Sequence, residues 1–197
     1  YMVIQGANDQ DVSVFMGNEQ YENVSFTGEG DYRKISLYLA GANHGQFNTL
    51  WGKYDMEPPF SWWLNVADFI SQDEQQYLLK VFSRAFFDVT LKGDTTYESL
   101  LYDEGRYERY LPKTLYAQQY DTSSSRLIAD FEEDSDVTTA TDGSVCDAVH
   151  MAMWTEERIT DSDENRGERE NHGLYLKWDH TREAEYEITF GENRDLS

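Results

Sequence analysis

The sequence predicts an α/β region followed by an all-β region, and three observations lead to this fold class. Two short apolar runs near the start, residues 1–6 and 34–40, each end in a loop of small residues, as buried parallel strands do. A capped amphipathic stretch at residues 71–86 predicts a long helix after them. From Arg126 onward, short runs with alternating polar and apolar residues predict antiparallel strands.

The segments that connect these elements are polar or rich in aromatic residues. Residues 11–21 predict a short helix between the two strands, and residues 27–31 form a turn cluster rich in glycine. Residues 48–68 carry many aromatic side chains around Pro58 and Pro59. This composition predicts a loop or flap that packs over the end of the second strand.

The most regular predicted element is the helix that follows this flap. Ser71 with Glu74 three residues later forms a capping box, a typical helix start. The apolar residues beyond it recur at helical spacing: Tyr77, Leu78, Val81, Phe82, Ala85 and Phe86. A second short helix is expected at residues 96–101, and Pro112 ends the region.

The all-β region is expected at residues 120–197, after an α/β region at residues 1–115. Its strand-like runs lie at residues 126–131, 148–155, 173–178 and 184–190. Period-2 alternation with turns at short intervals predicts a jelly-roll-like antiparallel sandwich. This pattern resembles the galactose-binding-like modules appended to secreted carbohydrate- and ester-active enzymes, and we expect the sandwich to be truncated at its C-terminal end.

Composition narrows the classes of partner. The chain has 38 acidic and 16 basic residues and a formal net charge of −22, which disfavours nucleic-acid phosphates and anionic membrane surfaces. No apolar run approaches the ~20 residues that span a bilayer, so no membrane span is predicted. Cys146 is the single cysteine, which excludes an intrachain disulfide and leaves the compartment open, with a secreted or periplasmic location slightly favoured.

The loops at the ends of the two apolar runs carry the candidate active site. Residues 6–12 present Asp9, and residues 41–48 present His44. Because the carboxyl ends of neighbouring parallel strands meet at one edge of a sheet, we expect these two side chains to meet. A carboxylate that orients a histidine is two thirds of a nucleophile-activating triad. Asp11 is the second choice for the acid.

The order and spacing of these loops resemble the C-terminal half of an α/β-hydrolase. Gly-Ala-Asn-Asp-Gln-Asp-Val at residues 6–12 is similar to the acid turn of that family, Gly-x-x-Asp-x-x-Val. Gly-Ala-Asn-His-Gly-Gln-Phe-Asn at residues 41–48 is similar to the catalytic histidine loop of bacterial esterases and lipase-like members. The resemblance spans residues 1–115. It implies that Asp9 and His44 belong to a Ser-Asp-His triad acting on a small-molecule or lipid ester.

The third member of such a triad is missing from the sequence. No serine lies in the Gly-x-Ser-x-Gly context of a nucleophile elbow, and Tyr1 lies inside an apolar run. We therefore expect a fragment of a longer protein, inactive alone, whose preceding part supplies the nucleophile and the oxyanion donors. The alternative is a non-catalytic hydrolase-like scaffold whose β-sandwich binds a glycan.

Aromatic residues give two further sets of candidate binding residues. The first set is expected to line an acyl or aromatic pocket beside His44, with core packing as the alternative: Phe47, Trp51, Trp62 and Trp63. The second set is expected either to pack in the sandwich core or to stack on a sugar: Trp154, Tyr175 and Trp178.

No cofactor or metal site is predicted, and calcium is kept only as a minor alternative. Residues 161–165 alternate oxygen-bearing side chains, but the later positions that an EF-hand loop needs hold Arg166 and His172. Residues 130–136 form a second acidic cluster, for which a solvated loop is the simpler interpretation. The histidines after His44 have no metal-ligand spacing to one another.

Overall fold

A computed structural model describes residues 1–12, 16–63, 65–158 and 172–191. The chain divides into two compact units, Tyr1–Ser125 and Arg126–Ser197. The first mixes helices with a sheet, and the second contains antiparallel strands. This mixed content of helices and small sheets is compatible with the predicted α/β region followed by an all-β region.

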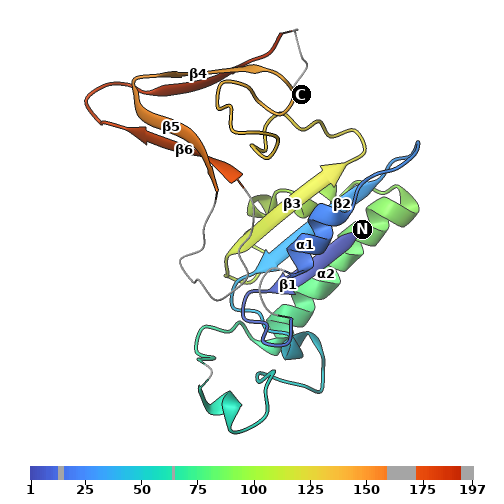
Figure 1. Cartoon of the computed structure of the whole chain (residues 1–197). Coiled ribbons are helices and arrows are strands. Elements are labelled where there is room, and N and C mark those ends of the chain that lie inside the picture. Colours follow the sequence, from blue (N-terminus) through green and yellow to red (C-terminus); the bar gives the residue numbers. More distant parts are fainter. Residues whose placement is uncertain (13–15, 64, 159–171, 192–197) are drawn as a thin grey trace. The chain divides into compact units, whose positions relative to one another are not determined.

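The first unit is built on a three-stranded mixed sheet (Figure 1). Strand β1 (Met2–Gly6) pairs in parallel with β2 (Arg33–Leu39), and β2 pairs antiparallel with β3 (Tyr116–Thr122). The two parallel strands are those that the apolar runs predicted. Gly6 lies opposite Leu39, so β1 and β2 end at the same edge of the sheet.

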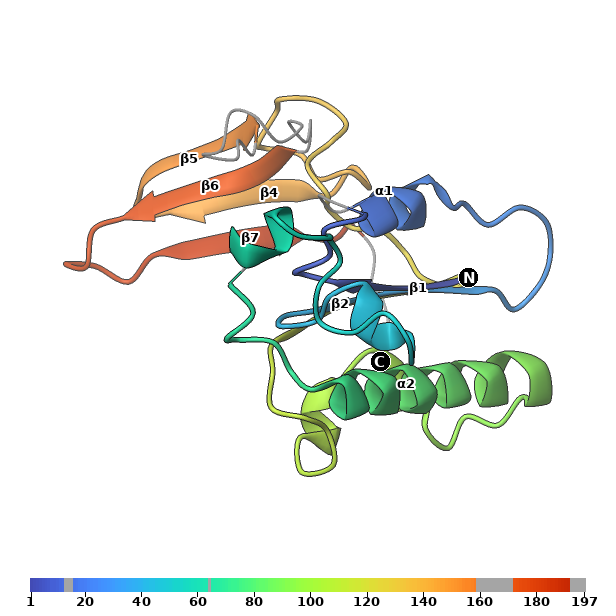
Figure 2. The same cartoon turned by 90° about the horizontal axis from the view of Figure 1, so that it is seen from below.

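Two helices cover opposite faces of this sheet (Figure 2). Helix α1 (Met16–Asn23) lies over one face, and the long helix α2 (Gln72–Lys92) lies over the other. The capping box is confirmed, because the Ser71 side chain accepts from the Glu74 amide while the Glu74 carboxylate accepts from the Ser71 amide. Gly93 ends α2 with a left-handed φ of 67°, a conformation that glycine adopts without strain.

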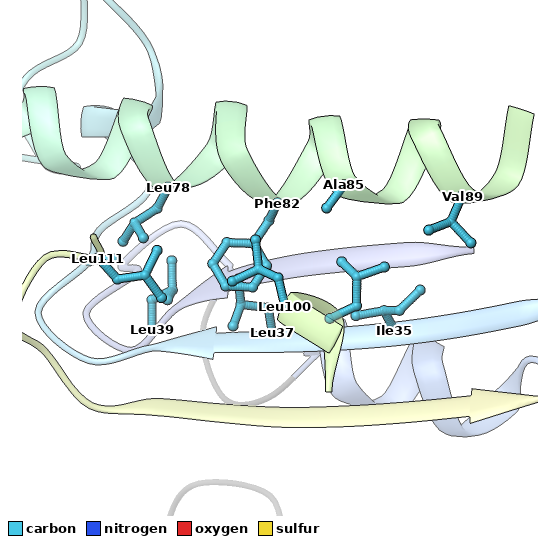
Figure 3. Packing of buried hydrophobic residues seen from close by; sticks show 11 residues of the cluster. Ile35, Leu37, Leu39, Leu78, Phe82, Ala85, Val89, Leu100 and Leu111 are labelled. Atoms are coloured by element: carbon cyan, nitrogen blue, oxygen red, sulfur yellow. The ribbon is translucent and has the colours of Figure 1, made fainter. Parts of the chain in front are cut away.

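The core of the first unit lies between α2 and β2 (Figure 3). Alternate residues of β2 point at the helix, and residues at helical spacing on α2 point back at the strand. All of them are almost fully buried: Ile35, Leu37, Leu39, Leu78, Phe82, Ala85 and Val89. The other face of β2 turns to α1, where the Ser36 hydroxyl lies 3.3 Å from Oδ1 of Asn18.

The described part of this unit also contains short 3₁₀ helices. They are η1 (Gly45–Phe47), η2 (Phe60–Trp63), η3 (Glu98–Leu101) and η4 (Glu104–Tyr107). The helix expected at residues 96–101 is therefore the single 3₁₀ turn η3. The described residues of the 48–68 segment form η2 and otherwise have no helix or strand, in keeping with the predicted flap.

The boundary between the units lies later than the sequence pattern suggested. Strand β3 falls across the expected division at residues 115–120, yet it belongs to the first unit. It pairs with β2 along its whole length, and Tyr116 and Tyr120 pack against the α2 core. The first unit therefore extends to Ser125 rather than ending at residue 115.

In its described residues, the second unit contains two antiparallel ladders of two strands each. Strand β4 (Val145–Val149) pairs with β7 (Glu185–Thr189), and β5 (Met151–Arg158) pairs with β6 (His172–Trp178). The strand expected at residues 126–131 is wrong. That segment is a loop held to the turn that precedes β4, where Asp142 donates its amide to the Ile128 carbonyl.

Candidate active site

The acid loop and the histidine loop are in direct contact at the carboxyl ends of β1 and β2. The Ala7 amide donates to the Leu39 carbonyl, and the Asn8 amide donates to the Ala42 carbonyl, both at 2.8 Å. A Cβ atom on Gly6 would lie 2.5 Å from the Ala42 oxygen, so only glycine allows this approach. Backbone contacts alone therefore fix the acid loop against the histidine loop.

Asp9 and His44 form a hydrogen-bonded pair in this contact. Oδ2 of Asp9 lies 3.0 Å from Nδ1 of His44. The Asp9 side chain is 9% exposed, and that of His44 is 34% exposed. Oδ1 of Asp9 accepts the amides of Asp11 and Val12 at 2.9 and 2.8 Å, which orients the carboxylate. A carboxylate at Nδ1 favours the tautomer that leaves Nε2 with its lone pair.

The structure separates the two candidate acids by their contacts. Asp9 bonds the imidazole, whereas the contact that Asp11 makes at this site is the backbone amide that it donates to Asp9. Asp11 is exposed to solvent. This geometry places Asp9, the first choice, beside His44.

A cavity of about 380 Å³ opens beside the pair. Its lining combines the Asp9–His44 pair and one further polar side chain with apolar and aromatic residues: Ile4, Gly6, Asp9, His44, Phe47, Asn48, Trp51 and Leu79. Trp51 stacks on the imidazole, with ring centroids 5.6 Å apart and an interplanar angle of 13°. The cavity therefore offers an apolar wall next to one partly exposed imidazole.

The four aromatic candidates for substrate contact lie in two different places. Phe47 and Trp51 line the cavity, as expected for residues beside His44. Trp62 and Trp63 lie in η2, are 77% and 88% exposed, and do not line this cavity in the described part of the chain. The second pair is thus neither buried under the flap nor at the imidazole.

A further polar residue of the site, Asp55, was not predicted from the sequence. Its Oδ1 accepts the Gly45 amide at 2.7 Å and Nδ2 of Asn43 at 2.6 Å. Its Oδ2 accepts the His44 amide at 3.0 Å and the Gln10 amide at 3.2 Å. Asp55 lies in the flap and belongs to no periodic pattern, so the sequence offers no local signal for it.

The candidate sugar-binding aromatics of the second unit do not share one face. Successive side chains of a strand point to opposite faces, so Tyr175 and Trp178 of β6 face opposite ways. They are 43% and 47% exposed. Trp154 of β5 packs edge-on against Tyr186 of β7, with centroids 6.0 Å apart. Cys146 is buried, as expected of a small apolar residue.

The acidic clusters show no arrangement for a cation where they are described. Among the described residues, no group of three or more His, Cys, Asp and Glu side chains could hold a metal ion. In the 130–136 cluster, carboxylates of Asp130, Asp134 and Asp136 accept backbone amides of their own turns. The alternating run at 161–165 lies outside the described residues.

Comparisons with known proteins add no assignment to this geometry. No protein-family model, curated protein or solved structure matches the chain. In the described ranges, no helix has both the length and the apolar character needed to cross a membrane.

Proposed function

We propose that this chain carries the acid and the base of a Ser-Asp-His triad of a carboxylic ester hydrolase. The observation that supports this most directly is the 3.0 Å contact between Asp9 and Nδ1 of His44. It occurs at the carboxyl ends of two parallel strands, the edge at which open α/β sheets bind their ligands. In this proposal the first unit is the C-terminal part of an α/β-hydrolase domain, and α2 is its last helix.

The two side chains have complementary roles in such a reaction. His44 takes the proton from a serine hydroxyl as that hydroxyl attacks the ester carbonyl, and Asp9 stabilises the imidazolium that forms. The same imidazolium then donates its proton to the departing alkoxide. Phe47 and Trp51, which line the cavity, would contact the apolar part of a small-molecule or lipid ester.

The nucleophile in this proposal comes from polypeptide outside the chain. No serine of the sequence has the Gly-x-Ser-x-Gly context that exposes a hydroxyl at a strand-to-helix turn. Ser36 and Ser61, two serines of the first unit, are buried. β1 lies at the edge of the sheet, and among the described residues its outer side pairs with no strand. Further parallel strands that carry the nucleophile can add there.

The test is ester hydrolysis by this chain produced together with the polypeptide that the proposal requires as the source of the nucleophile. We expect turnover of short-chain nitrophenyl esters and labelling of one serine by a fluorophosphonate. His44→Ala should abolish both, and Asp9→Asn should lower kcat by about 10⁴ because it favours the wrong tautomer. Asp11→Asn is the matched control and should leave kcat unchanged. Equal turnover with alanine at position 44, or no labelled serine, would refute the assignment.

A second candidate is a non-catalytic hydrolase-like scaffold whose second unit, a galactose-binding-like jelly roll, binds a glycan. The exposure of Tyr175 and Trp178 supports it, because exposed aromatic rings can stack on sugars. Their opposite directions on β6 weaken it, since a sugar platform needs rings on one face. Titration of the chain with galactose and its oligomers, followed by tryptophan fluorescence, tests this function. An unchanged spectrum at millimolar sugar would reject it.

A further inference from the structure

The flap is joined to both loops of the candidate active site through one carboxylate, that of Asp55. Gln10 directly follows Asp9 in the acid loop, and its amide donates to Asp55. His44 and Gly45 of the histidine loop donate their amides to the same carboxylate. Asp55 therefore connects three segments that are distant in sequence: the acid loop, the histidine loop and the flap.

The approach of the flap depends on the glycine after His44. A Cβ atom on Gly45 would lie 2.6 Å from the Gly52 carbonyl oxygen and 2.9 Å from Oδ1 of Asp55. Only glycine at this position lets the flap backbone come close enough for Asp55 to reach the amides. The small residue in the histidine loop thus has a structural use besides allowing the chain to turn.

A chain of buried amides extends this connection to α2. Nδ2 of Asn43 donates to Asp55, while Oδ1 of Asn43 accepts from Nε2 of Gln75 at 3.3 Å. Asn43 is 1% exposed and Gln75, on α2, is fully buried. Buried amides of this kind keep their geometry because any unmade hydrogen bond is costly. The carboxylate of Asp55 is therefore held at its inner end by a rigid part of the core.

We propose that Asp55 is the positioning residue that latches the flap to the catalytic loops and thereby holds His44 against Asp9. The inference rests on the proposed function for its catalytic meaning, but its geometry can be tested on this chain alone. All four groups that contact the Asp55 carboxylate are N–H donors, two at each oxygen, so these contacts need an acceptor at both side-chain oxygens. Release of the latch would free Trp51 together with the flap, because Trp51 stacks on His44 from that segment.

The experiment is nuclear magnetic resonance of the whole chain and its Asp55→Asn variant. Asparagine keeps the size of the side chain but replaces one acceptor oxygen with an NH₂ group that faces donors. We expect the amides of Gln10, His44 and Gly45 to exchange with solvent at least about tenfold faster in the variant. We also expect the neutral His44 ring to lose its preference for the Nδ1–H tautomer. Glu57→Gln removes an exposed carboxylate from the same flap and should change neither readout.

The amides of α2 distinguish release of the latch from loss of the fold. If those amides stay protected in Asp55→Asn while the His44 tautomer changes, Asp55 positions the ring. If the His44 tautomer is the same as in the parent, or if the exchange rates of the three loop amides stay within about twofold of the parent, the proposal is wrong. If the variant unfolds, the test is hydrogen exchange of the Gln10 amide in the parent chain, because this amide lies in an exposed loop and donates to Asp55. Exchange of that amide at the unprotected rate in the parent would overturn the latch.

These readouts are independent of ester turnover. A chain that never hydrolyses an ester can still show a latched His44, which would refute the proposed function and leave the inference intact. An active hydrolase with an unaffected His44 ring in Asp55→Asn would refute the inference and leave the function intact.

Discussion

The contact between the two loops makes Gly6→Ala the most informative single change outside the polar residues. The Cβ atom of an alanine at position 6 would lie 2.5 Å from the Ala42 oxygen, 2.7 Å from the Ala42 carbonyl carbon and 3.1 Å from the Asn43 nitrogen. All three atoms belong to the backbone and cannot rotate away. Since non-bonded heavy atoms need roughly 3.5 Å, the loops must separate by about 1 Å.

This separation has a cost that the structure allows us to work out. Overpacking that forces backbone shifts costs about 1–3 kcal/mol. Movement of the loops also lengthens the 2.8 Å hydrogen bond from the Asn8 amide to the Ala42 carbonyl, a bond worth about 1 kcal/mol. We therefore expect Gly6→Ala to lower the free energy of unfolding of the first unit by about 2–4 kcal/mol. In an active hydrolase, a misplacement of about 1 Å can cost 10²-fold in rate.

The assay is urea unfolding monitored through hydrogen exchange of the β2 amides, so that the readout reports the first unit alone. Gly105→Ala is the matched control, because its Cβ would meet only Oδ1 of Asp103 at an ordinary 3.5 Å. We expect the control to change stability by less than about 0.5 kcal/mol. If Gly6→Ala and Gly105→Ala unfold at the same urea concentration, the close contact of the two loops is not as described and the reasoning fails.

Three further predictions concern the core, pH and salt. Leu78→Ala, at a fully buried position of α2, should cost about 3–5 kcal/mol, whereas Leu91→Ala on the same helix, 76% exposed, should be nearly neutral in the same urea assay. Burial tends to raise the pKa of Glu98, but hydrogen bonds from Tyr120 and Arg33 outweigh it and lower that pKa. The stability that Glu98 contributes is therefore present above the ordinary glutamate pKa of 4.5 and is lost as pH falls through the lowered value. We expect the melting temperature of Glu98→Gln to fall less than that of the parent when the pH is lowered in a series of thermal melts. Finally, the net charge of −22 implies repulsion between surface charges, which ~1 M NaCl screens to a Debye length of about 3 Å. We expect the melting temperature to rise as NaCl increases to that concentration, and a flat or falling trend would contradict the repulsion.

Local patterns predicted the helix and the two parallel strands because each depends on burial of one face. The spacing from Tyr77 to Phe86 follows the turn of a helix. Leu78, Phe82 and Ala85 of that set are buried in the core beside β2, whereas Tyr77 is exposed. The capping box and the C-terminal Gly93 act through neighbouring backbone groups, which the sequence contains in full. Asp9 and His44 were identifiable because parallel strands bring their carboxyl ends together.

The local patterns could not predict which strand the more polar segments pair with. The residues of β3, Tyr-Ala-Gln-Gln-Tyr-Asp-Thr, alternate too weakly to indicate which sheet they join. Their place beside β2 follows from seven backbone pairs and from the tyrosines that reach the α2 core. Conversely, residues 126–131 have strand-like composition but pair with no strand among the described residues, where they form a loop.

Local sequence patterns identified the residues that could make an acid–base pair and the segments that bury their apolar faces. The surroundings of the pair depend on the tertiary structure: the stacking of Trp51 on His44, the exposure of Trp62 and Trp63, and the four hydrogen bonds to Asp55. The difference comes from the range of the interactions. Helix caps and amphipathic faces arise from residues a few positions apart, whereas a carboxylate that joins three loops depends on where the whole chain brings their amides.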